Sequence, residues 1–242
     1  MRFYTSNPVF NAFFWKKEAS KNKMTLNGIL FKMFFSLLLV SLSFSYVWHL
    51  VYKGESIKWY IYIGLFSALF FSILTSYKHK WAFFTVPFYA ISKGFFLGGF
   101  SAYTNQRFEG LPQKAVSITI ITFFVMLFLY KLKIVVVTKK FRSILYSTIA
   151  TIFTIYIIAF ILRLFAIPFN LVHGTSWFSI LFTLVASIAA SFSLILDFYY
   201  LDKQLYKAPK YKEWVAVWGF LVTLIWMYVE ILRLFKKLAI RF

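Results

Sequence analysis

Three ionisable residues stand where an apolar chain accommodates charge least easily, and a fourth lies close to one of them. Asp197 lies in "SLILDFYY", Glu230 in "WMYVEILRLF" and Lys93 in "YAISKGFFLGG", and Arg233 follows Glu230 by three positions. A charged side chain at the bilayer centre costs about 2.5–3.5 kcal/mol on insertion scales, so such residues face protein or water and mark ion or proton pathways. These four residues are therefore the candidate site.

Glu230 has two interpretations. Arg233, three residues on, shares its helix face and neutralises it locally. In the other interpretation Glu230 faces Asp197 in a bundle core, where two close carboxylates cannot both ionise cheaply and share a proton. Such a pair is a pH-sensitive latch, or a site for a hard cation such as Ca²⁺. Counting helix rise puts Asp197 nearer the cytoplasm by roughly 10–15 Å, so contact requires an offset or a kink, for which Gly219 is a candidate.

The surrounding chain predicts helices that cross a membrane. Of 242 residues, 61% are hydrophobic and only 14% are charged, whereas soluble domains carry about a quarter charged residues. The apolar blocks are long enough to span the hydrocarbon core and lack the alternation of a β-barrel. Seven spans are predicted: 29–51, 58–76, 82–103, 114–131, 143–166, 176–200 and 214–238. We expect an all-α membrane protein with a basic cytoplasmic segment at 1–28 and a seven-span domain at 29–242.

The net charge of +20 is explained by topology better than by nucleic acid, which we do not expect as a partner. With the N-terminus inside, 16 of the 27 Lys and Arg residues fall in cytoplasmic segments, seven in outer segments and four within spans. This bias favours a cytoplasmic N-terminus. Seven spans then place the C-terminus outside, against which its own basic residues argue mildly; a re-entrant last segment would return it to the cytoplasm.

The remaining polar residues predict no catalytic or metal centre. The chain has no cysteine, its three histidines stand alone, and no nucleotide-binding, serine-hydrolase or intramembrane aspartyl-protease motif is found. We expect no enzymatic activity and no cofactor. Lys32, Arg163 and Arg233 lie near span ends, where their side chains can extend to the headgroups. Glu213 is assigned to a loop.

Several stretches resemble one family of membrane proteins. They are "NPVF", "MTLNGILFKMF", "PFYAISKGFFLGGFSAY", "LPQKAVSITIITFFVMLFLYK", "IVVVTKKFRS", "LILDFYYLD" and "KEWVAVWGFLVTLIWMYVEILRLFKKL". Together they cover nearly the whole chain and resemble the Bax inhibitor / YccA-like family, in its bacterial branch.

The resemblance implies a seven-helix bundle with the last helix at its centre. It also implies that an acid in span six and another in span seven, here Asp197 and Glu230, sense pH and gate a calcium leak. Relatives commonly carry glutamate where this chain has Lys93. A lysine near two carboxylates favours their charged forms and repels a divalent cation, so Lys93 and Arg233 are expected to act as modulating counter-charges. In the alternative interpretation Lys93 faces elsewhere.

Two functions follow as expectations. The first is a pH-sensitive leak for Ca²⁺ or H⁺ in the bacterial inner membrane, in which Asp197 and Glu230 bind Ca²⁺ if it binds at all. The second is a non-conducting modulator of stress or proteolysis. It would act through membrane proteins such as the membrane-bound FtsH protease, with residues 1–28 as the contact segment.

Overall fold

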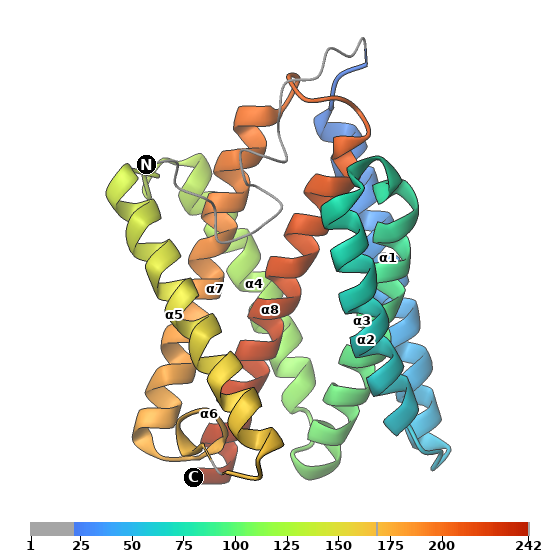
Figure 1. Ribbon diagram of the computed structural model, residues 1–242, viewed down its shortest axis with the longest axis vertical. Helices are drawn as coiled ribbons and strands as arrows, with labels where there is room; N and C mark the ends of the chain where they lie inside the picture. Colours follow the sequence, from blue (N-terminus) through green and yellow to red (C-terminus); the bar gives the residue numbers. More distant parts are fainter. Residues whose placement is uncertain (1–21, 168, 242) are drawn as a thin grey trace. The chain divides into compact units, whose positions relative to one another are not determined.

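The computed structural model describes residues 22–167 and 169–241 and consists of helices joined by short connections (Figure 1). The long helices are α1 (Leu26–Tyr52), α2 (Lys58–Tyr77), α3 (Ala82–Arg107), α4 (Leu111–Lys131), α5 (Lys139–Leu164), α7 (Trp177–Gln204) and α8 (Lys212–Arg241). Two short helices, η2 (His79–Trp81) and α6 (Asn170–His173), lie between them.

All seven long helices are long and apolar enough to cross a membrane, which confirms the predicted fold class. The predicted ends differ from the observed ends by at most four residues. Helix α8 is the most buried of the seven, as a central last helix requires. Residues 1–21 of the predicted basic segment lie outside the described residues, and α1 begins at Leu26 rather than at position 29.

Side-chain caps explain where several helices begin. The Thr25 and Thr138 hydroxyls accept hydrogen bonds from the backbone N–H groups of Gly28 and Phe141, each at 3.1 Å. Ser176 accepts one from Ser179 N–H at 3.3 Å. Each cap satisfies a donor that the first helical turn leaves without an intrahelical partner.

The chain forms two compact units, and each is described by itself. Unit 1 contains residues 110–199 and 222–241, and therefore α4, α5, most of α7 and the C-terminal part of α8. Aromatic side chains join its helices. Phe198 of α7 meets Phe123 and Tyr130 of α4 with ring centroids at 5.6 and 5.9 Å, and Tyr156 of α5 meets Phe182 of α7 at 5.6 Å.

Unit 2 contains residues 22–109 and 200–221, and therefore α1, α2, α3 and the start of α8. Glycines bring α3 close to α1: a Cβ atom on Gly98 would lie 2.8 Å from the Phe44 carbonyl oxygen, and one on Gly94 would collide with Ser43. Small residues allow this kind of close approach between membrane helices.

A buried ion pair in unit 2 corrects two sequence-based assignments. Glu213 belongs to the first turn of α8 rather than to a loop, and it is fully buried. Lys32 donates a hydrogen bond to its carboxylate instead of extending to the headgroups. The Thr25 N–H and hydroxyl donate to the same carboxylate at 2.9 and 3.1 Å. We call Thr25, Gly28, Lys32 and Glu213 the α1–α8 clasp. The first turn of α8 packs beside the start of α1, which brings the Glu213 carboxylate to Lys32.

The chain immediately before the clasp is also tied down. Lys23 and Pro209 form an isolated β-bridge. Met24 N–H donates to the Ala208 carbonyl at 2.8 Å, and Tyr206 N–H donates to the Met24 carbonyl at 3.1 Å. The start of the described chain is therefore fastened to the connection between α7 and α8.

Candidate functional site

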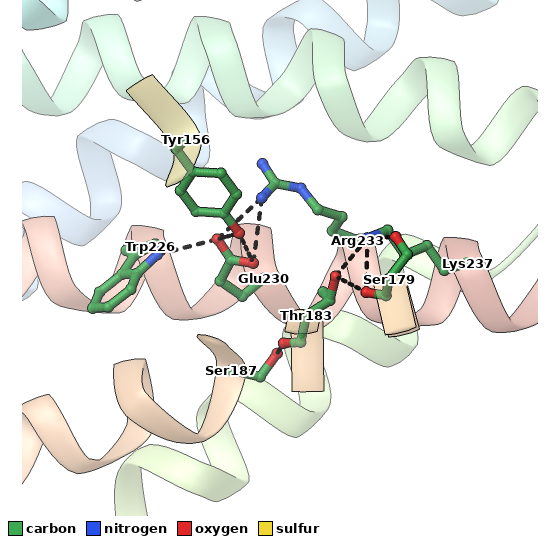
Figure 2. Close-up of polar contacts among 8 residues, drawn as sticks. All are labelled: Tyr156, Ser179, Thr183, Ser187, Trp226, Glu230, Arg233 and Lys237. Atoms are coloured by element: carbon green, nitrogen blue, oxygen red, sulfur yellow. Dashed lines mark hydrogen bonds and ion pairs between the residues drawn. The ribbon is translucent and has the colours of Figure 1, made fainter. Parts of the chain in front are cut away.

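Glu230 lies on α8 in unit 1 with 1% of its surface exposed. Its carboxylate receives hydrogen bonds from three side chains (Figure 2). The Tyr156 hydroxyl lies 2.9 and 2.8 Å from its two oxygens, and Trp226 Nε1 lies 3.1 Å from Oε1. The third donor is Arg233. Because charge-assisted hydrogen bonds are stronger than neutral ones, Arg233 is the strongest of the three donors.

Arg233 is the counter-ion of Glu230. Its Nη1 lies 3.2 Å from Oε1 and 3.4 Å from Oε2. Its guanidinium carbon lies 4.8 Å from the centroid of the Tyr156 ring. One tyrosine thus contacts both members of the ion pair. The local ion pair between Glu230 and Arg233 that the sequence suggested is therefore present. Arg233 is also close enough to Glu230 to act as its counter-charge.

A buried cation lies two turns beyond Glu230 along α8. Lys237 is 5% exposed, and its ammonium group donates to Ser179 and Thr183 on α7 (Figure 2). Lys237 was one of the seven basic residues that the sequence-based topology counted in outer segments. Two signals pointed to the observed position. Lys237 follows Glu230 by seven residues, which returns to the same helix face. Hydroxyl residues also recur every four positions along α7, at 179, 183, 187 and 191.

These α7 hydroxyls bond back along their own helix. Thr183, Ser187 and Ser191 each donate to the carbonyl four residues earlier, at 3.0, 2.9 and 2.9 Å. Since the hydroxyl protons are used in this way, the side chains present oxygen lone pairs to the neighbouring helix. The face of α7 that is turned toward α8 is consequently rich in hydrogen-bond acceptors.

Asp197, the second acid of the predicted site, lies on α7 and belongs to unit 1, as Glu230 does. It is 1% exposed. Lys237 contacts Ser179, and Ser191 contacts Met227 at 3.6 Å. This antiparallel register sets Glu230 level with Ser187. Asp197 is ten residues beyond Ser187, about 15 Å along the axis at 1.5 Å per residue.

The two acids therefore occupy different levels of unit 1. Among the described residues Glu230 bonds to Tyr156, Trp226 and Arg233, and not to Asp197. The pairing of Asp197 with Glu230 as one pH-sensing site remains a prediction.

Lys93 lies on α3 in unit 2, where it contacts aromatic rings of its own helix. Its Nζ is 5.6 Å from the ring centroids of both Tyr89 and Phe96. Cation–π contacts of this kind stabilise an ammonium group in apolar surroundings. The predicted influence of Lys93 on Asp197 and Glu230 remains a prediction.

No cluster of three or more potential metal ligands (His, Asp, Glu) occurs among residues 22–167 and 169–241. The expectation that Asp197 and Glu230 would supply the oxygen ligands if Ca²⁺ binds remains a prediction.

The fold and these charges define a helical integral membrane protein with carboxylates and counter-charges in its interior. The chain belongs to the Bax inhibitor 1 like family, whose model matches residues 7–240. Comparison with curated proteins and with solved structures gave no match.

Proposed function

We propose that this protein is a pH-sensitive cation leak of the bacterial inner membrane, conducting Ca²⁺ or H⁺ without catalysing a reaction. The observation that carries the proposal is that Asp197 and Glu230 are each 1% exposed on helices able to span a membrane. Ionisable groups at such positions are costly, and proteins use them in ion and proton pathways. Family membership is consistent with a membrane function of this kind.

The charge balance around Glu230 suggests how protons would act on the leak. When Glu230 is ionised, its negative charge offsets the positive charge of Arg233. Lys237 then leaves one net positive charge in this group of three residues. Protonation of Glu230 would leave Arg233 and Lys237 as two cations about one helical turn apart on α8, with no neighbouring anion to offset their repulsion. The α7–α8 contact at Lys237 would then weaken, which is the kind of local charge change that shifts a two-state bundle.

The antiparallel register of α7 and α8 separates the two carboxylates along the helix axis. Two successive carboxylate positions along one route therefore fit the described contacts better than a single pair that shares a proton. Asp197 and Glu230 would then each receive a cation or proton in turn. Each of the two acids should therefore be required for pH-dependent flux.

Flux into liposomes tests the leak. The native protein should conduct Ca²⁺ or H⁺ more rapidly as the pH falls. The variants Asp197→Asn and Glu230→Gln, singly and together, should lose at least tenfold in flux or lose its pH dependence. The matched control is Glu55→Gln, which removes an exposed acid outside the helices. Unchanged flux in the double variant would remove both acids from the mechanism.

A second candidate function, a non-conducting modulator of membrane proteins such as a protease, has one observation in its favour. The start of the described chain is fastened to the α7–α8 connection through Lys23 and Pro209. A partner of the basic N-terminal segment would therefore act close to α8. Loss of crosslinked partners after deletion of residues 2–20, in a protein that shows no flux, would favour this function over the leak.

A further inference from the structure

The environment of Lys237 is that of a cation-binding site. Its Nζ lies 2.6 Å from Thr183 Oγ1, 2.7 Å from Ser179 Oγ and 3.1 Å from the Ser179 carbonyl oxygen. These three oxygens are its hydrogen-bond partners among the described residues, and all three are neutral. Buried lysines are normally paired with a carboxylate, whereas Lys237 is surrounded by hydroxyl and carbonyl oxygens (Figure 2).

The direction of the hydrogen bonds makes the three oxygens acceptors only. The Ser179 hydroxyl donates its proton to the Gly174 carbonyl at 2.7 Å, and the Thr183 hydroxyl donates to the Ser179 carbonyl at 3.0 Å. Neither hydroxyl has a proton left for Lys237. Three acceptors around one nitrogen require three N–H donors, which only the charged ammonium form provides.

We propose that Ser179 and Thr183 form a monovalent-cation site that Lys237 fills with its own ammonium group. Carbonyl and hydroxyl oxygens replace the hydration shell of a weakly hydrated monovalent ion. Calcium, in contrast, takes six to eight oxygens that normally include carboxylates. Ammonium and potassium ions are similar in size, so both fit the space that Nζ occupies.

The position of this cation site also suggests a role in the proposed leak, and this part of the inference rests on the proposed function. Lys237 and Glu230 lie on one face of α8, and Lys237 lies nearer the end of the helix. A positive charge fixed there repels cations approaching Glu230 from that end. Lys237 thereby closes one end of the route that Glu230 serves.

The variant Lys237→Met tests the site directly. Methionine keeps the apolar stem of lysine but ends one atom before the nitrogen, which leaves a gap of ammonium size beside the three oxygens. Purified Lys237→Met should melt about 2–4 °C higher in ammonium or potassium chloride than in choline chloride at equal ionic strength. Choline is too large for the gap. The native protein, whose site is filled, should melt at the same temperature in all three salts.

Three controls keep the result specific. Lys236→Met removes the neighbouring, partly exposed lysine and should create no salt preference. Lys237→Met combined with Thr183→Val removes one ligand oxygen and should abolish the preference. Lys237→Gln ends at the same side-chain position as methionine but turns two N–H donors, rather than a methyl group, toward the oxygens, so it should fold and show no salt preference. A Lys237→Met protein that melts equally in all three salts, or that unfolds in all three while Lys237→Gln stays folded, would overturn the proposal.

Flux separates this inference from the proposed function. If both hold, Lys237→Met should raise potassium or ammonium flux several-fold in the same liposomes. A salt preference without any flux, in the variant or in the native protein, would support the cation site and count against the leak. Flux that depends on Glu230, without a salt preference in Lys237→Met, would support the leak and count against the cation site.

Discussion

At the scale of single residues, the site is governed by an asymmetry within one ion pair. Glu230 has 1% of its side chain exposed, whereas Arg233 retains 29%. The carboxylate therefore depends on its protein partners, while the guanidinium can reach the edge of the protein. Tyr156 and Trp226 add two neutral donors to the carboxylate, so the surroundings stabilise the anion more fully than the cation.

This asymmetry predicts unequal effects of the two neutral substitutions. Arg233→Gln leaves a buried carboxylate without its counter-ion and should destabilise the protein by about 3 kcal/mol. Glu230→Gln leaves an arginine that can turn outward, and should cost about 1 kcal/mol. Thermal unfolding in detergent measures both, with Lys236→Gln as a control of small effect. Equal losses, or a larger loss for Glu230→Gln, would contradict the asymmetry.

At the scale of elements, the α1–α8 clasp fixes the first turn of α8 to the start of α1. Gly28 is required there because a Cβ atom at this position would collide with the Glu213 carboxylate, lying 2.5 Å from Oε1 and 2.6 Å from the carboxyl carbon. The carboxylate in turn holds Lys32 and Thr25. Steric space at one glycine thus determines whether the ion pair forms.

Gly28→Ala should therefore displace Glu213 and destabilise the protein by about 1–3 kcal/mol, the usual cost of overpacking. Glu213→Asp withdraws the carboxylate by one methylene. Combined with Gly28→Ala, it should recover part of the loss, so the double variant should be more stable than the sum of the two single effects. The measurement is a double-mutant cycle of thermal unfolding. Strict additivity would mean that the collision does not determine the cost.

At the scale of the whole molecule, the spans and their charges predict a definite topology. Exposed lysines lie in the connection between α4 and α5 and at the helix ends beside it, and the bias of basic residues assigns this connection to the cytoplasm. The connection between α3 and α4 and the end of α8 are then assigned to the outside.

The chain contains no cysteine, so single introduced cysteines report topology without background. Lys140→Cys should react with a membrane-impermeant maleimide only after the membrane is opened. Glu109→Cys and Arg241→Cys should react in intact cells. All three native side chains are exposed, so the substitutions disturb little. Reaction of Arg241→Cys only in opened membranes would indicate a re-entrant last segment, and reversal at all three positions would contradict the orientation.

The sequence predicted the fold well because each helix is an apolar block bounded by basic or capping residues. Asp197 and Glu230 were identifiable because a carboxylate in such a block is costly. The contacts of Lys32, Glu213 and Lys237 were not predicted. Each depends on which helices lie side by side and in what register, and hydropathy along a single chain carries no such information. The ends of α1 and α8 also extend beyond their apolar blocks, which is why Glu213 was assigned to a loop.

The attachment of the first described residues to the α7–α8 connection has a mechanical consequence. Lys23 and Met24 are bonded to Pro209 and Ala208, and the clasp joins the following turn of α1 to Glu213. Helix α8 then continues without interruption to Glu230 and Lys237. Within unit 2, a force applied at Lys23 and Met24 would therefore be transmitted to the first turn of α8.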